Sequence, residues 1–182
     1  MKRVGMMGLG NMGESIVRGL LGAGLAKKGI IGFEIKDARA RVIEKTYGIK
    51  IVKDPRELVK QSDYVILAMK PQDAKAAVQT IAPLINDSKI IISIMAGVTT
   101  SNITSMLEKQ AKIVRIMPNI CLSVAEGAMG IAASYSLSRE EIDSIISLFI
   151  PLGTIVEVGE EQMDAITALS GSGPAFVLSF LE

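Results

Sequence analysis

The chain has 182 residues, enough for one good-sized domain, and 49% of them are apolar, enough to fill a core. A net charge of +1, without blocks of like charge, argues against a nucleic-acid or membrane-surface partner. The sequence has no histidine, which excludes imidazole acid–base chemistry and imidazole metal ligands, and we expect no metal site. Cys121 is the only cysteine, so no internal disulfide forms, and we expect a cytoplasmic protein.

Neither a secretory signal nor a membrane span is predicted. Gly8, Gly10 and Gly13, with the charged Glu14 and Arg18, interrupt the N-terminal apolar stretch that a signal needs. Uninterrupted apolar runs along the chain all fall short of the roughly 18 residues of a membrane span.

Short apolar runs alternate with longer segments of helical spacing. The runs are nearly continuous in apolar residues, as expected of strands buried on both faces of a sheet. The predicted strands are Val4–Gly8, Ile30–Ile35, Ile49–Val52, Tyr64–Met69, Ile90–Ile94 and Ile113–Met117. The predicted helices are Asn11–Gly22, Asp37–Tyr47, Pro55–Gln61, Pro71–Ile85 and Thr100–Lys109, with Asp37 as a candidate cap. This alternation implies an α/β fold with a doubly wound, mostly parallel sheet of Rossmann type.

After Met117 the alternation changes. Gly127–Ala133 and Thr154–Val158 are predicted as added strands. The helix Ser138–Ile150 between them begins with the capping box SREE. We place the end of the first domain near residues 159–164.

The sequence GLGNMG, residues 8–13, follows the first predicted strand and opens the first predicted helix. In a βαβ unit this spacing is typical of a dinucleotide site, in which Gly8 makes the turn, Gly10 admits a pyrophosphate and Gly13 lets the helix pack closely. The first-turn amides and the helix dipole then face the phosphates. An ordinary tight turn is the alternative.

Residues after the second predicted strand bear on the choice between NAD and NADP. Glu34 lies about 20 residues after Gly13, where an acidic side chain accepts from ribose hydroxyls and repels a 2′-phosphate. Lys36, Arg39 and Arg41 follow, and one of them turned inward would meet a 2′-phosphate. We expect a preference for NADH weaker than a lone carboxylate would give. A solvated strand end is the alternative role for Glu34.

Two more loops follow predicted strands at the edge where doubly wound folds bind ligands. AMKP, residues 68–71, places Lys70 near the cofactor or in solvent. SIMAGV, residues 93–98, has small residues that would admit a nicotinamide ring or ribose, or that simply pack closely.

Together with RIMPN at residues 115–119 and LSGSGPAF at residues 169–176, these motifs resemble pyrroline-5-carboxylate reductases in order and spacing. The resemblance covers essentially the whole chain, and RIMPN with SGSGPA is more specific than the glycine loop. It implies NAD(P)H-dependent reduction of the C=N bond of 1-pyrroline-5-carboxylate, giving L-proline in the last step of proline biosynthesis.

The resemblance also assigns cofactor contacts by position, with NADP or NAD as the cofactor, and it assigns no catalytic residue. Glu34 and Lys36, the two candidates after the second strand, complete the set. The predicted contacts are Gly8, Leu9, Gly10, Asn11, Met12, Gly13, Glu34, Lys36, Ala68, Met69, Lys70, Pro71, Ala96, Gly97 and Asn119.

The chain departs from the family in three ways. Ile120 and Cys121 replace a usual Thr-Pro, and Phe176 replaces a frequent Tyr. Family members also continue into an all-helical domain that forms the dimer and holds the substrate carboxylate. We therefore expect residues 1–160 to form the NAD(P)-binding domain, and residues 161–182 to begin a truncated helical dimerisation domain. We expect a homo-oligomer formed through that helical domain in the full-length protein, and from this chain alone we expect cofactor binding with little turnover.

Two other functions stay open on the sequence. One is a related β-hydroxyacid or imine reductase, against which RIMPN and SGSGPA argue. The other is a non-catalytic nicotinamide-nucleotide-binding module, for which the apolar tail Pro174–Leu181 should be covered within the fold or by a partner.

Overall fold

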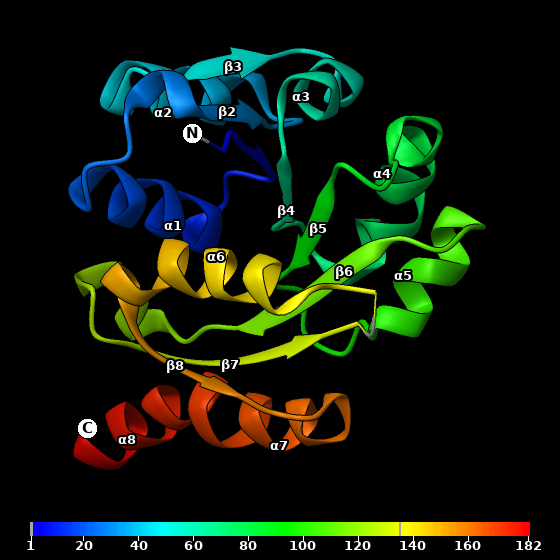
Figure 1. Ribbon diagram of the computed structural model, residues 1–182. Coiled ribbons are helices and arrows are strands. Elements are labelled where there is room, and N and C mark those ends of the chain that lie inside the picture. The colour runs from blue at the N-terminus through cyan, green and yellow to red at the C-terminus, as the bar shows by residue number, and fades with distance from the viewer. Residues whose placement is uncertain (1, 135) are drawn as a thin grey trace.

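The computed structural model describes residues 2–134 and 136–182, and an eight-stranded sheet forms its centre (Figure 1). The strands lie in the order β3-β2-β1-β4-β5-β6-β7-β8. β6 and β7 pair antiparallel, and the other neighbours pair parallel. The predicted doubly wound, mostly parallel sheet is thereby confirmed. The strands are β1 (Val4–Met7), β2 (Ile30–Phe33), β3 (Lys50–Val52), β4 (Tyr64–Leu67), β5 (Ile90–Ser93), β6 (Lys112–Met117), β7 (Gly127–Ala133) and β8 (Gly153–Glu157).

The α-helices agree with the predicted segments except in one place. Predicted as a single helix, Pro71–Ile85 is divided into α4 and two flanking 3-10 turns, Pro71–Asp73 and Ala82–Leu84. Pro83 lies in the second turn and has no N–H to continue the α-helical hydrogen bonds. The helices are α1 (Asn11–Gly22), α2 (Asp37–Tyr47), α3 (Pro55–Gln61), α4 (Ala74–Ile81), α5 (Thr100–Leu107), α6 (Arg139–Phe149), α7 (Met163–Ile166) and α8 (Gly173–Leu181).

Of the two helix caps predicted from the sequence, one is confirmed and the other is wrong. Ser138 and Glu141 form the predicted capping box, with the Ser138 N–H donating to Glu141 Oε2 at 3.0 Å. Asp37, in contrast, is the first residue of α2. Lys36 takes the N-cap position and makes no side-chain cap.

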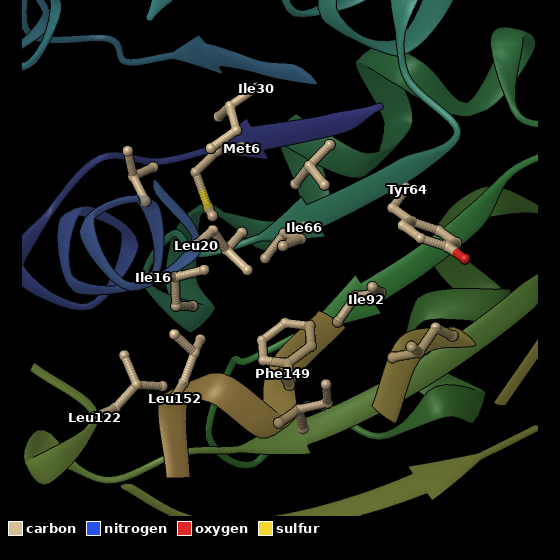
Figure 2. Close-up of a cluster of buried hydrophobic side chains, with 14 of the residues drawn as sticks. Met6, Ile16, Leu20, Ile30, Tyr64, Ile66, Ile92, Leu122, Phe149 and Leu152 are labelled. Atoms are coloured by element: carbon tan, nitrogen blue, oxygen red, sulfur yellow. The ribbon is translucent and has the colours of Figure 1, made fainter. Parts of the chain in front are cut away.

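Alternate residues of each strand point to opposite faces of the sheet, and both faces are buried. On one face, Met6 and Ile66 pack with Leu20 of α1 and Phe149 of α6, as Figure 2 shows. On the other face, strand residues such as Leu67 pack against α3, α4 and α5. Burial on both faces explains the continuous apolar runs in the sequence.

The order of the strands creates the expected ligand position. β1 and β4 are parallel neighbours, but the chain leaves β1 for α1 on one face and leaves β4 for α4 on the other. The connections therefore diverge at the carboxyl ends of β1 and β4, which is where doubly wound folds leave room for a ligand.

After β8 the chain continues as a helical segment, residues 160–181. Met163 of α7 packs on Met117 and Ala132 and forms a small third core. The apolar side chains of α8 are exposed, with Phe180 at 88%. By length and composition alone the 22 residues of this segment would cross a membrane, which is weak evidence because such segments also occur in soluble proteins.

Arg115 joins this segment to the centre of the sheet. It lies on β6 between Ile113, which belongs to the core under α5, and Met117, which belongs to the core under α7. Arg115 is 1% exposed, and its Nη1 forms an ion pair with Glu160 at the start of the helical segment. Its Nη2 is buried without a hydrogen-bond partner in the described part of the chain. A buried guanidinium depends strongly on the one carboxylate it has.

We expect Glu160→Ala to lower the free energy of unfolding by about 2 kcal/mol, below the usual cost of breaking a buried pair because Glu160 is partly exposed. Glu161→Ala removes the same charge from the neighbouring exposed position and should have little effect. Urea unfolding of both variants measures the difference. Equal losses in the two would contradict a specific role for the pair.

Candidate functional site

The loop after β1 turns at Gly8, which has a φ of +94°. This conformation strains any residue with a side chain. A Cβ added at Gly8 would also lie 2.7 Å from the carbonyl oxygen of Ala68. The Gly8 N–H donates to Phe33 O at 2.9 Å. Gly8 is therefore fixed between the ends of β2 and β4, and only glycine fits there.

Gly10 and Gly13 differ sharply in their surroundings. A Cβ added at Gly13 would lie 2.2 Å from Gly8 O, so glycine lets α1 approach the end of β1. A Cβ added at Gly10 would meet nothing within 4 Å, and Gly10 has ordinary backbone angles, φ −64° and ψ −169°. Nothing in the fold itself therefore requires glycine at position 10. The backbone at Gly10 is therefore accessible, as the close approach of a pyrophosphate would require.

The first turn of α1 presents its backbone amides to the open space at Gly10. Gly10 is the N-cap, and no side chain forms a cap hydrogen bond with the helix. Asn11 is exposed and Met12 is half-buried. Uncapped first-turn N–H groups, together with the helix dipole, favour an anion such as a phosphate.

Two side chains hold Leu9, the residue before Gly10, from opposite sides of its backbone. Glu34 Oε2 accepts from Leu9 N at 2.8 Å, and Arg39 Nε donates to Leu9 O at 2.8 Å. The other oxygen of Glu34 accepts from Lys36 N at 3.0 Å. Glu34 is therefore a half-buried residue bound to the glycine loop, and the alternative of a solvated strand end is wrong. The side chain of Lys36 is exposed.

Arg39 is itself held by Glu14, which Tyr47 holds in turn, and the sequence did not indicate this group of three residues. Its Nη2 forms an ion pair with Glu14 in the first turn of α1, and Tyr47 donates to the other Glu14 oxygen at 2.8 Å. Arg39 and Tyr47 lie eight positions apart on α2, and that helical spacing was the only signal in the sequence. Among Glu14, Arg39 and Tyr47, the sequence indicates a role near the ligand for Arg39 alone, as a candidate partner of a 2′-phosphate.

The ionisation of this group is fixed at neutral pH. Burial raises the pKa of Glu14, but the hydrogen bonds from Tyr47 and Arg39 and the charges of Arg39 and Arg18 outweigh it, so the pKa lies below its usual value. Burial and the hydrogen bond to Glu14 raise the pKa of Tyr47. Glu14 is therefore charged and Tyr47 is protonated.

The loop after β4 lies directly beside the glycine loop. Ala68 and Met69 supply the atoms that an added Cβ at Gly8 would meet, and Ala68 N donates to Met7 O at 2.8 Å. Lys70 and Pro71 follow at the exposed start of a 3-10 turn. Lys70 therefore extends from the site edge into solvent.

The remaining predicted residues follow β5 and β6 at the same edge of the sheet. Ala96 and Gly97 are exposed, and Gly97 has a φ of +69° with open space beside it. Asn119 is 8% exposed, and its Oδ1 accepts from Ala128 N at 3.2 Å. Asn119 thus anchors the start of β7, while its amide nitrogen stays available to donate.

The chemistry of this edge fits an elongated, anionic, ribose-containing ligand. It offers free amides for a diphosphate, a carboxylate near the end of β2 for hydroxyls, and small residues after β5 for a flat ring. In the described part of the chain, no group of three or more His, Cys, Asp or Glu residues is placed to hold a metal ion.

Comparisons with known proteins agree with this chemistry. A family described as NADP oxidoreductase, coenzyme F420-dependent, matches residues 3–97. A pyrroline-5-carboxylate reductase from Methanosarcina acetivorans is 36% identical over 100% of this chain and 67% of its own length. The chain spans about two thirds of the length of such curated relatives.

Solved structures of such reductases also match this chain over nearly its whole length. A pyrroline-5-carboxylate reductase from Coxiella burnetii matches with a TM-score of 0.93 and 30% identity over 98% of this chain and 67% of its own. A pyrroline carboxylate reductase from Plasmodium falciparum, solved with NADP bound, matches with a TM-score of 0.90 and 29% identity over 98% of this chain and 66% of its own.

We expect Gly10→Ala to leave the free energy of unfolding nearly unchanged but to weaken dinucleotide binding by about tenfold or more, because the methyl group would occupy the space for the diphosphate. Gly13→Ala should instead destabilise the fold, because its Cβ would clash with Gly8 O. Calorimetric titration and urea unfolding of both variants separate the two effects. Unchanged binding in Gly10→Ala would remove Gly10 from the site.

We also expect Glu14 to contribute to stability in a pH-dependent way. Because its pKa is lowered on folding from the ordinary 4.5, the contribution is complete above about pH 4.5 and is lost as pH falls through the folded pKa. The difference in unfolding free energy between the unaltered protein and Glu14→Gln should therefore shrink between pH 7 and pH 3 or so. A difference that stays constant over this range would contradict the shift.

Proposed function

Because the chain belongs to the pyrroline-5-carboxylate reductase family, we propose that it takes part in the reduction of 1-pyrroline-5-carboxylate to L-proline with a nicotinamide cofactor. The observation that carries the proposal is the open space at Gly10, between a loop fixed at Leu9 and the uncapped first turn of α1. The relatives that match over essentially the whole chain are reductases of a C=N bond by name.

The residues present fit a nicotinamide dinucleotide, which supplies a hydride when it is bound. We propose that Gly10, Asn11 and Met12 bind the diphosphate through their backbone amides. Glu34 would accept from the adenosine ribose, with Lys36 at the solvent side. The loop formed by Ala68, Met69, Lys70 and Pro71 would border the adenosine half of the cofactor.

At the other end of the site, Ala96 and Gly97 would leave room for the nicotinamide ring. Asn119 would donate from its amide nitrogen, because its oxygen is engaged by Ala128 N. Ala96, Gly97 and Asn119 place no bulky side chain over the carboxyl end of β5. A ring and a small substrate would therefore have room to stack there within hydride-transfer distance.

We propose that residues 1–160 act as the nucleotide-binding domain and that residues 161–182 form a separate helical segment. The exposed side chains of α8, including Phe176 and Phe180, support a role for this segment in homo-oligomer contacts rather than in a membrane. Glu161 and Asp164 in its first turns, and Glu160 directly before it, also disfavour a lipid environment. A cytoplasmic location agrees with this assignment.

The proposal is tested by two measurements on the protein. Titration with NADH and with NADPH, followed by nucleotide fluorescence, should show saturable binding that Gly10→Ala weakens. Addition of 1-pyrroline-5-carboxylate should then give little proline, detected by mass spectrometry, at a rate that follows nucleotide occupancy. Absence of binding by either nucleotide would overturn the assignment of the site. Rapid, sustained proline formation would contradict the expected low turnover, and proline formation that does not depend on nucleotide occupancy would overturn the proposed reaction.

A further inference from the structure

Of the three basic residues that follow β2, only Arg39 contacts the glycine loop through its side chain. Lys36 and Arg41 are exposed, whereas Arg39 is partly buried, with 28% of its side chain accessible. Its Nε donates to Leu9 O, and its Nη2 is paired with Glu14. A guanidinium has five donors in a fixed plane, so the two contacts together fix its direction.

Without Arg39, the charge of Glu14 would oppose phosphate binding here, although a carboxylate in a first helical turn is favourable for the helix itself. Glu14 lies in the first turn of the helix whose amides face the open space at Gly10, where its negative charge would repel a phosphate. Arg39 neutralises that charge, and Tyr47 holds the carboxylate from the other side. The three residues form one unit in which Arg39 is occupied by an internal partner.

Glu34 and Arg39 converge on the same residue. Both bind the backbone of Leu9, Glu34 at its nitrogen and Arg39 at its oxygen. A ribose placed at Glu34 would then have the Arg39 guanidinium as a neighbour bound to the same loop residue. A guanidinium released from Glu14 would be free to pair with a 2′-phosphate, with which arginine forms strong, often bidentate hydrogen bonds.

On the basis of the proposed function, we propose that Glu14 and Tyr47 determine the choice of cofactor by holding Arg39 on the carbonyl of Leu9. They withhold the guanidinium from a 2′-phosphate, while Glu34 repels that phosphate directly. The two effects add, and they bias the site toward NADH. Glu14 and Tyr47 act through Arg39 and are positioning residues.

The test is the ratio of the dissociation constants for NADPH and NADH, measured by calorimetry on the unaltered protein and on variants. Glu14→Gln frees the guanidinium and should lower the ratio by about tenfold, mostly through tighter NADPH binding. Tyr47→Phe loosens Glu14 without removing its charge and should lower the ratio by a smaller factor, about twofold to threefold. Binding of NADH should change by less than about threefold in both.

Two controls separate the role of Arg39 from a general loss of negative charge. Glu44→Gln removes a carboxylate from the exposed side of α2 and should leave the ratio unchanged. In the double variant Glu14→Gln with Arg39→Gln, the gain in NADPH binding should disappear, because no guanidinium remains to be freed. Thermal unfolding of each variant confirms that it is folded.

An unchanged ratio in Glu14→Gln and Tyr47→Phe, with NADH binding intact, would overturn the inference. A gain that persists in the double variant would also overturn it, because charge removal alone would then explain the result. Failure of the unaltered protein to bind either nucleotide is a different outcome, and it would refute the proposed function rather than the role of Glu14.

Discussion

The candidate site depends on how the backbone of the glycine loop is fixed without using the first-turn amides of α1. The N–H of Gly8 is taken by Phe33 O and the N–H of Leu9 by Glu34, while the carbonyl of Leu9 is taken by Arg39. These bonds hold the loop in place before any ligand arrives. The first-turn amides of α1 have no side-chain cap, so their hydrogen-bonding capacity remains for an anion. A loop held in this way loses little conformational freedom on binding.

The sheet makes this arrangement possible. β1 lies between β2 and β4, so residues that follow both neighbours reach the loop that follows β1. The close contacts of Gly8 with Ala68 and of Gly13 with Gly8 O tolerate no side chain, and the cores on both faces keep the strands in register. Substitutions at Gly8 and Gly13 therefore act on the fold. Gly10 differs, because its surroundings are open and the fold does not require glycine there.

Much of the fold was predictable from local sequence, and the ion pairs were not. Continuous apolar runs indicated strands buried on both faces, and their ends agree with the structure to within a residue or two because turns and prolines bound them. Pro83 divided a helix whose apolar spacing continued through it. The Glu14–Arg39 and Arg115–Glu160 pairs join residues distant in sequence, and no spacing rule predicts such partners. The predicted cofactor residues lie at one edge of the sheet, because the carboxyl ends of parallel strands share that edge. The contact between Tyr47 and Glu14, in contrast, depends on how α2 lies beside α1.

The ion pairs of this protein differ in what they can do, and burial explains the difference. Arg139 pairs with Asp143 and Glu157 on the surface, with more than half of its side chain exposed, where water and salt compete with the contact. Arg115 lies at the opposite extreme and cannot lose Glu160 without leaving a charge inside the protein. Arg39 and Glu14 are intermediate, each a little over one quarter exposed. Such a pair is strong enough to set the direction of a side chain, and close enough to solvent for a phosphate to compete with the carboxylate. The Glu14–Arg39 pair therefore orders the glycine loop and, on the proposed role of Arg39, also influences which nucleotide the site accepts.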